Sequence, residues 1–175
     1  MLRAVSHALD AGYRHIDSAV MYRNEAACGG AICDFIGDTK VPREGIFFTS
    51  KIYGVEPELD FKGVKRQSKG TLKVARLGYV GCILIHAPIN TSSGRKGVWR
   101  ALVETQEKGL TKSIGLSNYG IYHLLEMERH IKELEKERGE GNGGTRDVGQ
   151  WEMHPWLPRS DIVEWCRKRG LILRL

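Results

Sequence analysis

The stretch that decides the fold is GYRHIDSAVMYRNE, residues 12–25. Gly12 ends a short amphipathic segment that is expected to be helical. An alternating apolar and polar strand follows at residues 13–17 and ends on Asp17, and the next helical pattern begins at residue 24. The chain therefore passes from helix to strand and back to helix within a few residues, which is typical of an α/β fold.

The same alternation continues to the end of the chain. The predicted strands are residues 13–17, 46–50, 80–86, 113–117, 148–153 and 171–175, with helical patterns between them. Asp161 and Glu164 predict a capping box at the start of the last helix. Strands and helices in alternation predict a parallel sheet covered by helices. This pattern is compatible with a doubly wound sheet and with an incomplete eight-stranded barrel, although no glycine-rich phosphate turn follows the first strand.

Length and composition limit the class of protein. At 175 residues, of which 41% are apolar and 27% charged, we expect one globular domain spanning residues 1–175. The net charge is +6, but lysines and arginines alternate with acids, as in MERHIKELEKERGE at 127–140, which favours a solvated helix face over a nucleic-acid surface. The sequence predicts neither a membrane span nor a secretory signal, and therefore a cytoplasmic protein.

The cysteines do not form a pattern typical of a metal site. Cys28 and Cys33 are the pair nearest in sequence, and on a helix their spacing points the two sulfurs in different directions. We expect no metal site in this chain.

Polar side chains follow the predicted strands at their carboxyl ends, where parallel α/β proteins place their active sites. These residues are Asp17, Lys51, His86, Ser117 and Asn118, with Tyr22 in the loop after Asp17 and Gln150 inside the predicted strand 148–153. Each has an ordinary structural explanation by itself, such as a loop cap, a surface lysine, a core histidine or a turn former. Their common position at one rim predicts a functional site.

The residue types at this rim suit proton transfer to a carbonyl oxygen. A tyrosine hydroxyl gives up its proton more readily when a nearby positive charge stabilises the phenolate, and Lys51, kept charged by Asp17, can supply that charge. His86 can hydrogen-bond and orient the substrate oxygen. No side chain donates hydride, so a reduced cofactor is implied. An alternative is a Schiff-base aldolase with Lys51 as nucleophile, but Asp17 would hold that lysine charged.

Several motifs in this order resemble the aldo-keto reductase family. They are GYRHIDSAVMYRNE at 12–25, TSK at 49–51, LIH at 84–86, KSIGLSNY at 112–119 and GQWEMHPWL at 149–157. The resemblance covers nearly the whole chain. It implies a partial (β/α)8 TIM barrel in which the predicted strands correspond to strands two to seven of eight.

The resemblance also implies an activity, the reduction of aldehydes and ketones with NADPH and without a metal. Tyr22 is similar to the family's proton donor, Lys51 and Asp17 to the pair that activates it, and His86 to the residue that orients the carbonyl. Ser117, Asn118 and Gln150 are similar to the side chains that hold the nicotinamide carboxamide. The implied partner is a small carbonyl compound.

Some positions depart from the common family pattern. Ala87 is expected to widen the carbonyl pocket and Trp156 to line it, whereas Trp151 and Tyr119 are expected to pack in the interior. The glycine-rich GEGNGG at 139–144 is expected to be a flexible loop without chemistry.

The resemblance further implies that this chain is truncated at both ends, without the family's first and eighth strands and the segment that binds the 2′-phosphate of NADPH. We therefore expect the chain to bind NADPH weakly or not at all, and a catalytically inactive barrel fragment is the alternative reading. We also expect self-association through the open edges of the incomplete barrel.

Overall fold

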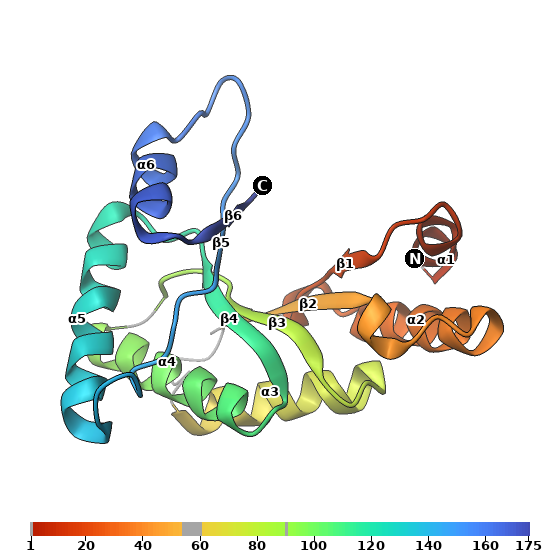
Figure 1. Cartoon of the computed structure of the whole chain (residues 1–175), viewed down its shortest axis with the longest axis horizontal. Coiled ribbons are helices and arrows are strands. Elements are labelled where there is room, and N and C mark those ends of the chain that lie inside the picture. The colour runs from red at the N-terminus through yellow and green to blue at the C-terminus, as the bar shows by residue number, and fades with distance from the viewer. Residues whose placement is uncertain (1, 54–60, 90) are drawn as a thin grey trace.

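The computed structural model describes residues 2–53, 61–89 and 91–175, and its helices and strands alternate along the chain (Figure 1). In chain order the elements are α1 (Leu2–Asp10), β1 (His15–Asp17), α2 (Glu25–Thr39), β2 (Phe47–Ile52), α3 (Phe61–Ala75), β3 (Val80–Ile85), α4 (Ser92–Glu107), β4 (Thr111–Ser117), α5 (Ile121–Arg138), β5 (Val148–Gln150), α6 (Ser160–Arg169) and β6 (Ile172–Arg174). Two short 3-10 turns, η1 (Val20–Tyr22) and η2 (Arg43–Gly45), precede α2 and β2. The predicted alternation is confirmed. No helix in the described ranges is long and apolar enough to cross a membrane.

The strands form one parallel sheet of six strands whose spatial order is the chain order, β1 to β6. A doubly wound sheet would reverse its strand order at a switch point, and this sheet does not. The sheet curls, and α2 to α6 lie along its outer side (Figure 1). The fold is therefore a partial (β/α)8 barrel, as predicted, with β1 and β6 as the edge strands of the sheet.

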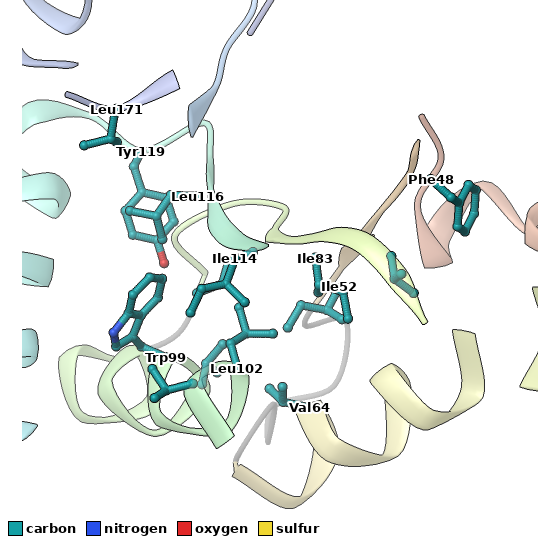
Figure 2. Packing of buried hydrophobic residues seen from close by; sticks show 14 of the residues in the cluster. Phe48, Ile52, Val64, Ile83, Trp99, Leu102, Ile114, Leu116, Tyr119 and Leu171 are labelled. Carbon is teal, nitrogen blue, oxygen red and sulfur yellow. The ribbon is translucent and has the colours of Figure 1, made fainter. Parts of the chain in front are cut away.

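The core lies between the sheet and the outer helices. Trp99 and Leu102 of α4 and Val64 of α3 pack beneath side chains of the central strands (Figure 2). β3 is buried at every position, as expected for a central parallel strand covered on both faces. Tyr119 and Trp151 are also buried, which confirms that they pack in the interior.

The structure corrects the predicted start of α6 and the predicted length of β5. α6 begins at Ser160, after Arg159 at φ 44°, and shows no side-chain cap, so the capping box was wrong. Asp161 lies in the first helical turn, where its negative charge suits the helix dipole. β5 ends at Gln150 because Trp151 turns into the core, where its indole N–H donates to the Tyr119 carbonyl at 2.8 Å.

The glycine-rich segment at 139–144 is packed rather than loose. Trp99 Nε1 donates to the Gly143 carbonyl at 2.9 Å. Arg138 Nη1 donates to the Asn142 carbonyl at 2.8 Å, and Asn142 Nδ2 donates back to the Arg138 carbonyl at 3.1 Å. The segment is held against α4 and α5, contrary to the expected flexible loop, because the tryptophan that anchors it lies far away in the sequence.

Candidate active site

The carboxyl ends of the strands surround a cavity of about 220 Å³. Its lining includes every predicted catalytic and cofactor residue, namely Asp17, Tyr22, Lys51, His86, Ser117, Asn118 and Gln150. Trp151, Glu152 and Leu175 also line it. Parallel pairing accounts for this convergence, since Asp17 lies opposite Thr49 and Ser117 lies opposite Gln150 in the register of neighbouring strands. The structure thus brings the seven predicted residues to one rim.

Lys51 and Asp17 form the charged centre of the cavity. The Lys51 ammonium donates to Asp17 Oδ1 and, at 3.1 Å, to the Ser18 carbonyl. Lys51 is only 4% exposed, so its ammonium is largely removed from water and is held by these two oxygens. The second oxygen of Asp17, Oδ2, accepts from Arg174 Nη2 at 3.0 Å and is 3.5 Å from Gln150 Nε2. One carboxylate therefore binds two cations, one from β2 and one from β6.

Tyr22 lies on η1, the turn that follows β1, between a cation and an imidazole. Its ring centroid is 5.2 Å from Lys51 Nζ and 5.6 Å from the His86 ring, which it meets edge-on. The turn ends at Arg23 in the left-handed conformation, with φ at 53°. Tyr22 is 49% exposed, so its phenol remains accessible from solvent while it borders the charged pair.

His86 directly follows β3 and is buried. Its backbone N–H extends the sheet by donating to the Ile52 carbonyl at 2.9 Å. Burial, and next the positive charge of Lys51, lower the pKa of His86 below the usual histidine value, so the ring is neutral at pH 7. Its Nδ1 has no hydrogen-bond partner among the described residues. A buried neutral imidazole with a free ring nitrogen can bind a carbonyl oxygen in the cavity.

Ser117, Asn118 and Gln150 form the amide-rich side of the cavity. Asn118, at φ 60°, donates through Nδ2 to the His86 carbonyl at 2.9 Å and to Ser117 Oγ at 3.1 Å. Its backbone N–H donates to the Gln150 carbonyl at 3.0 Å. Gln150 Oε1 is buried without a partner among the described residues, so it can accept from an amide group such as a carboxamide.

The comparisons with known proteins agree with this arrangement. Residues 1–173 match the model of the Aldo/keto reductase family. The chain belongs to the aldo/keto reductase family. It is 36% identical over 171 residues to an uncharacterized oxidoreductase of Schizosaccharomyces pombe, covering 97% of this chain and 56% of that protein. It is also 34% identical over 193 residues to prostaglandin F synthase 1 of Bos taurus, and this match covers 98% of this chain and 55% of that protein.

Solved structures of the aldo/keto reductase family have the same fold. An aldo/keto reductase from Brucella melitensis superposes with a TM-score of 0.82 at 32% identity, covering 98% of this chain and 59% of that one. The aldose reductase from Schistosoma japonicum superposes with a TM-score of 0.81 at 30% identity, covering 98% of this chain and 59% of that one. The chain thus spans little more than half the length of the aldo/keto reductases that it matches.

Two residues predicted to shape an aldo/keto reductase carbonyl pocket do not line the cavity. Trp156 is 87% exposed and contacts His154, with 5.9 Å between the ring centroids. Ala87 is half-buried in the segment after His86 and is likewise not among the lining residues. Within the described ranges, no group of three or more His, Cys, Asp or Glu side chains could hold a metal ion.

Sequence reasoning missed two neighbours of this candidate site. Arg174 reaches Asp17 from the last strand and also donates to Thr49 Oγ1 at 3.1 Å. Tyr53 meets the His86 ring edge-on at 5.5 Å, on a par with Tyr22. A charged residue inside the apolar run LILRL was the available signal for Arg174. No comparable signal marked Tyr53.

The buried histidines of this chain predict a pH-dependent stability. Burial lowers the pKa of His86 and of His130, so the unfolded chain binds more protons than the folded chain below the usual histidine value of 6.5. The free energy of unfolding is therefore expected to fall on acidification between pH 6.5 and 4.5. Lys-paired glutamates lose their stabilising contribution only below their unperturbed value of 4.5.

Urea denaturation across this window measures the effect, which for each histidine is at most about 1.4 kcal/mol per pH unit. The variant His86→Gln should show a shallower slope than the wild type. A stability that stays constant between pH 7 and pH 4.5 would contradict the expectation.

Proposed function

We propose that the protein reduces small aldehydes and ketones to alcohols, with NADPH as hydride source and Tyr22 as general acid. The observation that supports this most is the meeting of Tyr22 and His86 beside the Lys51–Asp17 pair in one cavity. These are the groups needed to orient a carbonyl oxygen and to protonate it. Family membership supports an oxidoreductase, and the finer assignment rests on this geometry.

The proton is assigned to the Tyr22 hydroxyl. When it passes to the substrate oxygen, a phenolate remains, and the nearby ammonium of Lys51 stabilises that negative charge. Asp17 forms an ion pair with this buried ammonium and fixes its position in the cavity. The same pair argues against a Schiff-base aldolase, because a nucleophilic lysine must be neutral and an ion-paired lysine is not.

His86 is assigned the orientation of the carbonyl group. Its neutral ring can donate one N–H to the carbonyl oxygen on the side facing Tyr22. A charged imidazolium would compete with Tyr22 as the acid, and the lowered pKa of His86 disfavours that form at neutral pH. The phenol and the imidazole thus have separate roles, proton transfer and positioning.

The amide-rich side of the cavity suits the cofactor. Ser117, Asn118 and Gln150 would hold the nicotinamide carboxamide, and the unpartnered Gln150 Oε1 fits its N–H₂ group. When bound, the reduced nicotinamide supplies the hydride that the protein's own side chains lack.

The proposal is tested with the purified chain, NADPH and a panel of aliphatic and aromatic aldehydes and ketones. We expect loss of NADPH absorbance that depends on the carbonyl compound. In a parallel titration, nicotinamide fluorescence should report weak but saturable NADPH binding. A folded chain that binds NADPH but oxidises it with no carbonyl compound in the panel would contradict the proposed reduction.

Self-association through the sheet edges remains part of the proposal. Ile172 of β6 is 62% exposed, and the adjoining Leu175 is 77% exposed. Exposed apolar side chains on an unpaired edge strand favour pairing with another chain. Sedimentation velocity over a range of protein concentrations would measure this association.

A further inference from the structure

We propose that a second pocket, at the opposite end of the strands from the candidate active site, binds a phosphate group. The pocket has a volume of about 570 Å³ and lies between α5, the segment before β5 and the end of α6. Thr145 and Arg146 precede β5, and Arg169 precedes β6, so the pocket opens at the amino ends of these strands. This binding is independent of the proposed carbonyl reduction.

The segment that carries Arg146 is held firmly at both ends. On one side, the Trp99 indole binds the Gly143 carbonyl. Gly144 has φ +84°, and a Cβ there would lie 2.3 Å from Val103 Cγ2, so only glycine allows this close approach. On the other side, Asp147 Oδ2 accepts the Ile114 backbone N–H at 3.0 Å. The backbone at Arg146 is therefore fixed by these contacts on both sides.

Two guanidinium groups compete for one carboxylate in this pocket. Arg169 donates through Nε to Glu128 Oε1 at 2.5 Å and through Nη2 to Oε2 at 3.4 Å, which engages both oxygens. Arg146 Nη1 is 3.3 Å from the same Oε1, close enough for attraction between charges. That nitrogen is nevertheless buried and makes no aligned hydrogen bond to any described residue. The two oxygens of Glu128 thus face two guanidinium groups, and a bound oxyanion would offer Arg146 further, better aligned acceptors.

Both guanidinium groups are oriented by the same aromatic ring. Arg169 Cζ lies 4.3 Å from the Trp165 ring centroid, and Arg146 Cζ lies 5.5 Å from it. Trp165 is itself buried. Stacking on a fixed ring reduces the freedom of each side chain, so less entropy is lost when the guanidinium groups bind a ligand.

The charges of the pocket favour an anion. Its cationic lining residues are Lys132, Arg146 and Arg169, against the two carboxylates Glu128 and Glu135. Burial lowers the pKa of Arg146, which indicates that Glu128 compensates its charge only in part. Arginine remains charged at neutral pH, and its planar fork binds phosphate oxygens in pairs. The volume accommodates a phosphate with a small organic group attached.

Isothermal titration calorimetry with inorganic phosphate and with glycerol phosphate tests the proposal. We expect saturable binding of at least one of them, and tighter binding of glycerol phosphate would identify an organic phosphate as the ligand. Arg146→Gln should weaken binding at least about tenfold. Arg167→Gln, an equal loss of charge at an exposed position of the same helix as Arg169, should leave binding unchanged. Absence of saturable binding, or equal weakening by both substitutions, would overturn the proposal.

A second measurement covers the case in which Arg146→Gln perturbs the fold. In ¹⁵N–¹H spectra of the wild type, phosphate should shift the backbone signals of residues 144–146 and 169–171. Shifts confined to the rim around Lys51 and His86 would overturn the proposal, because they would place the anion in the candidate active site.

Discussion

Replacing Asp17 with asparagine is expected to lower the free energy of unfolding by about 3 kcal/mol. The Asp17 carboxylate binds the buried ammonium of Lys51 through one oxygen and the guanidinium of Arg174 through the other. Asparagine keeps the shape of the side chain but removes its charge. Lys51, at 4% exposure, would then have only neutral oxygen acceptors, such as the Ser18 carbonyl, and no anionic partner among the described residues. Urea denaturation at pH 7 measures the loss.

The matched control is Asp38→Asn, which removes the same charge from an exposed position near the end of α2. Its effect should stay within about 0.5 kcal/mol. Adding Lys51→Met to Asp17→Asn should recover part of the lost stability, since no buried cation is then left unpaired. If Asp17→Asn proved as stable as Asp38→Asn, the ion pairs of Asp17 with Lys51 and Arg174 would not contribute to the stability of the fold.

Tyr22→Phe is expected to lower kcat/KM for carbonyl reduction at least about a hundredfold, which is the scale of a lost general acid. This expectation depends on the proposed function. The phenol is 49% exposed, so the substitution should change neither the unfolding midpoint nor nicotinamide binding. Steady-state NADPH oxidation with the best carbonyl compound of the panel, together with fluorescence titration, separates the two effects.

Tyr53→Phe is the matched control for that experiment. The Tyr53 ring also meets His86 edge-on, with centroids 5.5 Å apart against 5.6 Å for Tyr22. Only Tyr22 also lines the cavity that contains Lys51. Tyr53→Phe should therefore retain most of the activity. An active Tyr22→Phe variant beside an inactive Tyr53→Phe variant would reverse the assignment of the acid.

The sequence was sufficient to predict which residues converge at the rim. Asp17 and Ser117 each end a strand, as predicted, and parallel pairing aligns the carboxyl ends of strands along one edge. The position of such a residue in three dimensions follows from its position in its own strand. Local pattern and parallel topology were therefore enough to assemble this part of the site.

Contacts between segments distant in the sequence could not be predicted in this way. The Arg174–Asp17 ion pair joins residues 157 positions apart, and it forms because the sheet curls until β6 faces β1. Trp99 anchors the glycine-rich segment that was expected to be flexible. Trp156 was expected in the pocket, but the segment after β5 leaves it 87% exposed. Each of these outcomes depends on how sheet and helices pack, which no local pattern encodes.

The sequence by itself determined the alternation of strands and helices and the polar residues of the rim, because hydrophobic periodicity is a local property. The pattern left a doubly wound sheet and a partial barrel open, and the family resemblance pointed to the barrel. Only the tertiary structure decided how the charges are shared. The curvature of the sheet brings Arg174 to the Asp17 carboxylate, and the packing of α5 against α6 gives Arg146 and Arg169 a single carboxylate, Glu128, between them. Ion pairs form wherever folding brings opposite charges within a few ångströms, irrespective of their separation along the chain.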